Sequence, residues 1–161
     1  MSDSTALTVA PERSLSAAAG NDHDFVTMRL DGQLFGISVM AVQDVLRKLK
    51  VSPVPLSPDV IAGSLNIRGR IVTALAMRKR LNIPQNEQND TAMYVVVEYH
   101  NELYALVVDS VGDVLNLPMA QFEKPPANMD VGWRNVASGV FKLDQELLVI
   151  LDVSALIEGI A

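Results

Sequence analysis

The chain has 161 residues, of which 49% are apolar and 20% charged, which fits one globular unit or two small lobes that share a core. Its net charge of −6 argues against a general nucleic-acid binder, and no apolar run reaches the ~18–20 residues of a membrane helix. The absence of Cys excludes disulfides, thiolate metal sites and cysteine nucleophiles, and it fits a reducing cytoplasm.

Residues 1–24 are small and polar and lack the apolar segment of a signal peptide. We expect them to form a disordered N-terminal tail. Two apolar runs follow, over 25–31 and 33–39, and Asp31-Gly32 joins them. Asp-Gly favours a type I′ turn because both central positions need positive φ, so the sequence predicts a β-hairpin.

The spacing of apolar residues changes after Val39. Apolar residues then recur at helical intervals, which predicts a short amphipathic helix over 42–49. The same pattern returns over 111–115, where we expect a shorter helix that stops near Pro118.

The rest of the chain predicts short strands with brief helices. Prolines at 53, 55 and 58 predict an extended connector, because each lacks a backbone donor. Further elements are expected as strands over 61–67 and 71–75 joined at Arg68-Gly69, a helix over 77–81, a polar link over 84–91, a strand over 147–151, and a C-terminal helix that begins at Val153, ends at 158–159 and is capped by Asp152.

One pattern occurs twice along the chain. Residues 25–46 align without a gap on 94–115, and 63–77 align on 139–153. Two sets of equivalent strands imply two similar lobes with a seam between them. Such short strands predict an all-β fold with short helices, built as two small barrels and not as a layered α/β sheet.

The charge is unevenly distributed between the two copies. Residues 42–81 hold eight Lys or Arg against two Asp, whereas 91–161 hold three Lys or Arg against ten Asp or Glu. Either this is ordinary solvated surface, or it forms a basic patch aimed at an acidic partner.

Four motifs in order and spacing resemble the CheW-type chemotaxis coupling (adaptor) proteins. They are FGISVMAVQDVL (35–46), PDVIAGSLNIRGRIV (58–72), ALVVDSVGDVL (105–115) and LLVILDVSALI (147–157). The resemblance covers about residues 24–159 and implies two intertwined five-stranded β-barrels. It divides the chain into the tail and a single domain over 25–161. The two lobes of this domain span about 25–83 and 91–151, and the first exchanges strands with the second.

The resemblance also implies a cytoplasmic scaffold with no catalytic activity, cofactor or metal. Such a protein bridges transmembrane chemoreceptors to a histidine autokinase without entering the membrane itself. The helical hairpin tip of the receptor lies in the groove between the barrels. The regulatory domain of the kinase shares the fold and docks end to end with the coupling protein, and the two can alternate in rings. The coupling protein by itself is expected to be largely monomeric.

The family's receptor groove carries over to seven residues of this chain: Val42, Asp44, Val45, Asn66, Arg68, Val111 and Val114. The repeat supports this set, because the valine pair of one copy is equivalent to that of the other. Core packing is the alternative interpretation for each valine. Arg68 is the strongest candidate, since it occupies a turn tip, where side chains are exposed.

The kinase-binding surfaces implied by the resemblance are the approach to the Arg-Gly turn near Gly63 and the segment after Pro118, with Lys124 and Met129 as contacts. The chain departs from the family at Ala76, where the family commonly has Asp. Ala cannot cap a helix, so the helix over 77–81 is expected to lose roughly 1 kcal/mol of stabilisation.

Other functions remain as alternatives. An enzyme is disfavoured because no nucleophile–base motif or P-loop occurs, and His23 and His100 have no partner by motif. A small-ligand-binding barrel, or a regulatory CheW-like module of another signalling system with a non-flagellar output, stays open. A fragment of the kinase's own regulatory domain, or a fusion to a receiver, is disfavoured by the start Met, the complete repeat and the short chain.

Overall fold

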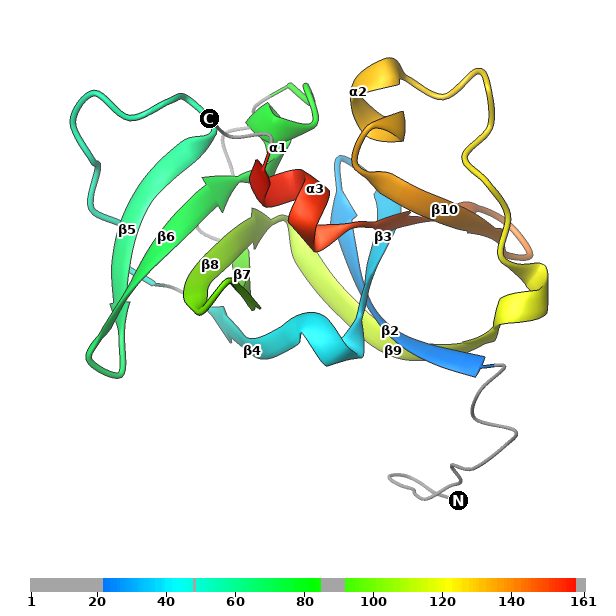
Figure 1. The fold of residues 1–161 in the computed structure, drawn as a ribbon, viewed down its shortest axis with the longest axis horizontal. Coiled ribbons are helices and arrows are strands. Elements are labelled where there is room, and N and C mark those ends of the chain that lie inside the picture. Colours follow the sequence, from blue (N-terminus) through cyan, green and yellow to red (C-terminus); the bar gives the residue numbers. More distant parts are fainter. Residues whose placement is uncertain (1–21, 48, 85–91, 159–161) are drawn as a thin grey trace.

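The structure, a computed structural model, describes residues 22–47, 49–84 and 92–158. The strands of these residues form two five-stranded sheets that lie side by side along the long axis of the molecule (Figure 1). Sheet 1 contains, in spatial order, β10 (Ala137–Lys142), β11 (Leu147–Leu151), β3 (Gln33–Ser38), β2 (Asp22–Leu30) and β9 (Ser110–Pro118). Sheet 2 contains β4 (Val42–Arg47), β7 (Met93–Tyr99), β8 (Glu102–Val108), β6 (Arg70–Ala76) and β5 (Ile61–Ile67).

The two sheets have the same architecture because the sequence repeat supplies equivalent strands. In the repeat β2, β3 and β4 correspond to β7, β8 and β9, and β5 and β6 correspond to β10 and β11. The order of sheet 1 then equals that of sheet 2 read backwards. Each sheet takes two strands from one half of the chain and three from the other, so the halves are intertwined as expected.

The mostly β fold is therefore confirmed. Backbone pairing of the described strands establishes two sheets, and the closure of each sheet into a barrel stays a prediction. The expected tail is too long at its C-terminal end, because residues 22–24 already belong to β2 and pair with residues 116–118 of β9. Residues 1–21 and most of the expected link, 85–91, lie outside the described residues.

Local turn chemistry places the hairpins where the sequence predicts them. Asp31 and Gly32 have φ of 54° and 82°, and Arg68 and Gly69 have φ of 52° and 82°. The equivalent turn of the second copy, His100-Asn101, also has positive φ at both positions. Both central residues of a type I′ turn require this conformation, which matches the right-handed twist of the flanking strands.

The helices predicted over 42–49 and 111–115 are wrong. Val42–Arg47 is strand β4, preceded by the 3₁₀ turn η3 (Val39–Ala41), and Ser110–Pro118 is strand β9. Each strand carries an irregularity in its pairing, between Val42 and Asp44 in β4 and opposite Val26–Met28 in β9. An extra residue in a bulged strand shifts the two-residue alternation by one.

This bulge explains the misleading pattern. Val42 and Val45 pair with Val97 and Val95, which are two residues apart and share one face of β7. Residues three apart in the bulged strand thus lie on a common face, and that spacing also belongs to a helix.

The remaining helices among the described residues are short. α1 (Met77–Arg80) and α3 (Val153–Glu158) lie where the sequence predicts helices, whereas η5 (Met119–Gln121) and α2 (Val131–Arg134) have no counterpart in the sequence predictions. Asp152 caps α3, because its Oδ1 accepts from the amide of Ser154 at 3.0 Å, whereas Ala76 offers α1 no side-chain cap, as expected. No helix among the described residues has the length and hydropathy required to span a membrane.

Three apolar clusters stabilise this arrangement. The largest is shared by both sheets: it contains Met28 and Phe35 of sheet 1, Val95 and Leu106 of sheet 2, and Leu156 of α3. One smaller cluster belongs mainly to sheet 2, and the other mainly to sheet 1. Figure 1 shows α3 over the centre, between the sheets. The shared cluster makes the boundary between the lobes part of the core.

Candidate functional site

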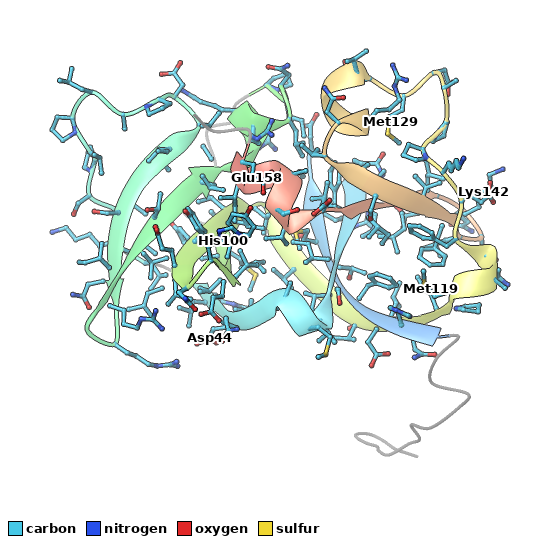
Figure 2. The ribbon with its side chains drawn as sticks, viewed as in Figure 1. Asp44, His100, Met119, Met129, Lys142 and Glu158 are labelled. Carbon is cyan, nitrogen blue, oxygen red and sulfur yellow. The ribbon has the colours of Figure 1, made fainter. Side chains whose placement is uncertain are left out.

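The structure joins Arg68 and Asp44, two of the predicted receptor contacts. Nη2 of Arg68 lies 3.0 Å from Oδ2 of Asp44, and their side chains are 78% and 27% exposed. Arg68 comes from the β5–β6 turn and Asp44 from β4, although β4 and β5 are opposite edges of sheet 2. Sheet 2 is therefore curled enough to bring this turn to β4. Figure 2 shows Asp44 on β4 along the same border of the molecule as the turn.

Local hydrogen bonds hold both ends of this ion pair. Oδ1 of Asp44 accepts from the amide of Val45 at 2.9 Å, directly after the bulge. Oδ1 of Asn66 accepts from the amide of Gly69 at 2.9 Å and so closes the turn that presents Arg68. Asn66 thus has a structural role in the turn. The pair leaves the guanidinium of Arg68 largely exposed, with donors available to a partner.

The four predicted valines differ in exposure. Val42 and Val111, equivalent in the repeat, are half-buried and pack against the shared core cluster. Val45 is half-buried, whereas Val114 on β9 is 55% exposed. Core packing therefore accounts for part of the burial of Val42 and Val111, and Val114 presents an open apolar surface.

The predicted kinase contacts lie in two separate places. Lys124 is exposed and Met129 is half-buried, and both belong to the segment between β9 and α2. Gly63 belongs to β5, at the far edge of sheet 2. Figures 1 and 2 show β5 and Met129 toward opposite ends of the long axis.

Gly63 is required by packing. It is buried with φ of 151°, and a Cβ there would lie 2.3 Å from the carbonyl oxygen of Ser52. Ser52 and Ser64 exchange two backbone hydrogen bonds across this point, at 2.8 and 2.9 Å. Gly139, the equivalent glycine, has the same constraint, because a Cβ there would lie 2.2 Å from Cζ of Phe122. The role of Gly63 as a kinase contact stays a prediction.

Trp133 connects the two halves near Met129. Its Nε1 donates to the carbonyl oxygen of Leu81 at 2.7 Å, and its ring meets Phe35 edge-on at 5.2 Å. Together with Met129 it lines a surface hollow of about 240 Å³. A larger hollow of about 360 Å³ opens beside β2 and α3, with Phe25, Ile37 and Ile150 in its wall. This hollow keeps the small-ligand alternative open.

The expected basic patch is smaller than the sequence suggests. Arg78 is buried in an ion pair with Asp109, which no local sequence pattern indicates. Nε and Nη2 of Arg80 donate to the carbonyl oxygens of Leu156 and Ala155 at the end of α3. Burial lowers the pKa of Arg80, which nevertheless remains charged. Among the described residues of this region, the exposed basic ones are Arg47, Lys50, Arg68, Arg70 and Lys79.

Comparisons with known proteins identify relatives over nearly the whole described chain. The model of the CheW-like domain matches residues 24–161. Chemotaxis protein CheW of Bacillus subtilis is 24% identical over 144 residues, covering 89% of this chain and 92% of the relative. Chemotaxis protein CheW of Thermotoga maritima is 28% identical over 144 residues, covering 89% and 93%. Protein FrzA of Myxococcus xanthus is 25% identical over 155 residues, covering 93% and 94%.

A solved structure has the same fold. The scaffolding protein TtCheW from Thermoanaerobacter tengcongensis matches with a TM-score of 0.73 at 24% identity, over 81% of this chain and 88% of that chain. The similarity thus spans most of both molecules.

Proposed function

Because the chain belongs to the CheW-like domain family, we propose that it is a non-catalytic chemotaxis adaptor that couples transmembrane chemoreceptors to a histidine autokinase. Relatives named chemotaxis protein CheW, and the similar solved structure of a scaffolding protein, support this proposal. The observation that carries it is the exposed guanidinium of Arg68, held by Asp44 at the border of sheet 2.

In this proposal the helical tip of a receptor docks along β4 and β9. Helices bind to proteins through apolar contacts at regular spacing, flanked by polar contacts that fix their register. Val114 supplies exposed apolar surface on β9, and the Arg68–Asp44 pair supplies the charged contact next to β4. An arginine fork fits a carboxylate or a helix C-terminus on the receptor.

The two separate kinase surfaces fit end-to-end assembly. A protein with contact surfaces toward opposite ends binds one neighbour at each end, and such heterologous contacts close into rings when the rotation permits. The surface near Gly63 and that around Lys124 and Met129 would each receive the regulatory domain of a kinase. In this account the protein works in the cytoplasm and reaches the membrane through its receptors.

The receptor surface is tested by reversing the Arg68–Asp44 pair. We expect Arg68→Glu to weaken binding to a receptor hairpin by about tenfold or more, because the contact loses its donors and gains a repulsive charge. The double variant Asp44→Arg with Arg68→Asp keeps the ion pair and the net charge but inverts its polarity. It should bind as weakly as Arg68→Glu, measured by calorimetry.

This test has a control variant and an outcome that would contradict it. Lys79→Glu makes the same change of charge at an exposed position of α1 and should leave the affinity unchanged. If the inverted pair restores the affinity of the unmodified chain, the ion pair acts only by joining the β5–β6 turn to β4, and a direct receptor contact by Arg68 is refuted.

The output served by this adaptor is a second question. A regulatory CheW-like module of a system without flagellar output would use the same surfaces. Deleting the gene and scoring both swimming and the other responses of the cell separates the two roles.

A further inference from the structure

Asp109 lies where the chain crosses from one sheet to the other. It is the single residue between Val108, the last residue of β8 in sheet 2, and Ser110, the first residue of β9 in sheet 1. Its amide donates to the carbonyl oxygen of Arg29 in β2 at 3.0 Å. The position of this residue therefore sets where β9 begins relative to both sheets.

Arg78 binds this crossover from sheet 2. Its Nε lies 3.0 Å from Oδ1 of Asp109 and its Nη2 lies 2.5 Å from Oδ2, so the two planar groups meet as a fork. Nη1 of the same guanidinium donates to the carbonyl oxygen of Pro84. Arg78 belongs to α1, which follows β6 directly, and its side chain is only 10% exposed.

The β2–β3 turn of sheet 1 joins the same cluster. The amide of Asp31 donates to Oδ2 of Asp109 at 2.8 Å, and the Asp31 carboxylate lies 3.7 Å from Nη2 of Arg78. Arg78 and Asp109 thus connect α1 of sheet 2, the crossover and the hairpin tip of sheet 1. We call this set, Arg78, Asp109 and Asp31, the clasp.

The equivalent crossover has no such charges. The chain passes from β3 in sheet 1 to β4 in sheet 2 through η3, where Met40 is the repeat equivalent of Asp109. Met40 is 87% exposed, and a thioether cannot form an ion pair. A repeated scaffold thus folds one of its two crossovers without a charged residue at this position, so a shared requirement of the fold does not explain the clasp.

We propose that Arg78 and Asp109 are positioning residues that hold sheet 1 against sheet 2 and thereby align β9 with β4 for receptor docking. This inference rests on the proposed function. The predicted contacts Val111 and Val114 follow Asp109 by two and five residues on β9, whereas Asp44 and Val45 lie on β4 in the other sheet. A receptor helix that touches both strands requires a fixed relation between the sheets.

The chemistry of the clasp suits positioning more than net stabilisation. Two charges lose hydration when they form a buried ion pair. This loss offsets much of their attraction, so the net contribution of the pair to stability is modest. Its directional bonds nevertheless fix geometry, because a guanidinium satisfies the carboxylate in only a few orientations. Lysine at this position keeps the charge but not the fork, so Arg78→Lys loosens the orientation while it leaves a countercharge for Asp109.

Distances between spin labels test this directly, because the chain contains no native Cys. One labelled pair, Ala62→Cys and Lys142→Cys, joins exposed positions on β5 and β10 and spans the two sheets. A second pair, Ala62→Cys and Glu98→Cys, lies within sheet 2 and serves as the internal control. Each pair is measured in the unmodified background, with Arg78→Lys and with Asp109→Asn.

A matched variant controls for the loss of an ion pair as such. Arg29 and Glu146 form a bidentate pair with both distances at 2.9 Å, but this pair is exposed and links β2 to the β10–β11 connection within sheet 1. Glu146→Gln should leave both distance distributions unchanged. Arg78→Lys and Asp109→Asn should broaden the distribution between sheets only, and should weaken binding to a receptor hairpin by about tenfold.

The outcomes separate this inference from the proposed function. An unchanged distribution between sheets in both clasp variants overturns the inference, and so does a broadened distribution with unchanged affinity for the receptor hairpin. If the unmodified chain does not bind the hairpin, the proposed function fails, while the distances still decide whether the clasp holds the sheets together.

Discussion

At the scale of single residues, Asp109 shows how a carboxylate keeps its charge in a partly buried place. Burial acts to raise its pKa, but hydrogen bonds from Arg78 and from the amide of Asp31, together with the charge of Arg78, outweigh burial and lower the pKa below its usual 3.8. The hydrogen bonds that Arg78 donates to Asp109 raise the pKa of the Arg78 guanidinium. Both shifts favour the charged pair in the folded state.

These shifts predict how stability depends on pH. A folded pKa below the unfolded one means that the stabilisation by Asp109 is complete above its ordinary pKa and is lost as pH falls through the folded value. The stability difference between the unmodified chain and Asp109→Asn should therefore be constant from about pH 5 to pH 7 and shrink below about pH 4. Urea unfolding at each pH measures it.

The exposed Arg29–Glu146 pair provides the comparison for this experiment. Its hydrogen bonds likewise lower the pKa of Glu146, but solvent screens the pair. Glu146→Gln should thus change stability little at any pH. A difference for Asp109→Asn that stays constant down to about pH 3 would contradict the assignment of the ion pair to Asp109.

At the scale of elements, each sheet has a glycine in an edge strand where a neighbouring segment packs closely. Because Gly63 has no side chain, the backbone of Ser52 can form hydrogen bonds to β5. Because Gly139 has none, the backbone of Glu123 can form hydrogen bonds to β10. Both glycines also lie at irregularities in strand pairing, between residues 61 and 63 and between residues 137 and 139. The repeat therefore preserves a bulged edge strand with a segment packed against it.

Substitution of Gly63 tests this packing. Gly63→Ala should reduce the free energy of unfolding by roughly 2–3 kcal/mol, because the added methyl group meets a backbone oxygen that cannot move freely. Gly69→Ala is the matched control: its φ is 82° but nothing lies within 4 Å of its Cβ, so only backbone strain of about 1 kcal/mol is expected. Equal losses in the two variants, measured by urea unfolding, would argue against the close approach at Ser52.

Elements were predictable from sequence where their cause is local. Asp31-Gly32 and Arg68-Gly69 define their turns by their own backbone preferences, and Asp152 caps α3 through its own side chain. For β4 and β9 the sequence predicts helices, because a bulge, which depends on the partner strand, gives the apolar residues helical spacing. For Arg78 the sequence predicts an exposed side chain, on solvated surface or in a basic patch, because its partner Asp109 is 31 residues away and no local pattern indicates it.

At the scale of the whole molecule, strand exchange interlocks the two halves of the chain. The shared core cluster, the clasp and the bond from Trp133 to Leu81 all join residues from different halves. The repeat predicts two equivalent lobes, because aligning the two copies of the sequence identifies their equivalent strands. It could not predict which strands pair between the halves through contacts distant in sequence, and the resemblance to a family supplied that expectation.

The candidate surfaces for the receptor and the kinase lie apart on the molecule. Arg68 and Asp44 lie together at the border of sheet 2, while the candidate kinase contacts lie toward opposite ends of the long axis. Partners at these places would not compete for one surface. The receptor and the kinase should therefore bind at the same time.

The adaptor role is tested most directly by mixing the chain with a receptor hairpin and the regulatory domain of a histidine autokinase, and measuring complex mass by size-exclusion chromatography with light scattering. We predict one complex that contains all three proteins. With Arg68→Glu, we predict that the kinase domain stays bound and the receptor hairpin elutes separately. A chain that binds neither protein, or binds only one at a time, would contradict the coupling function.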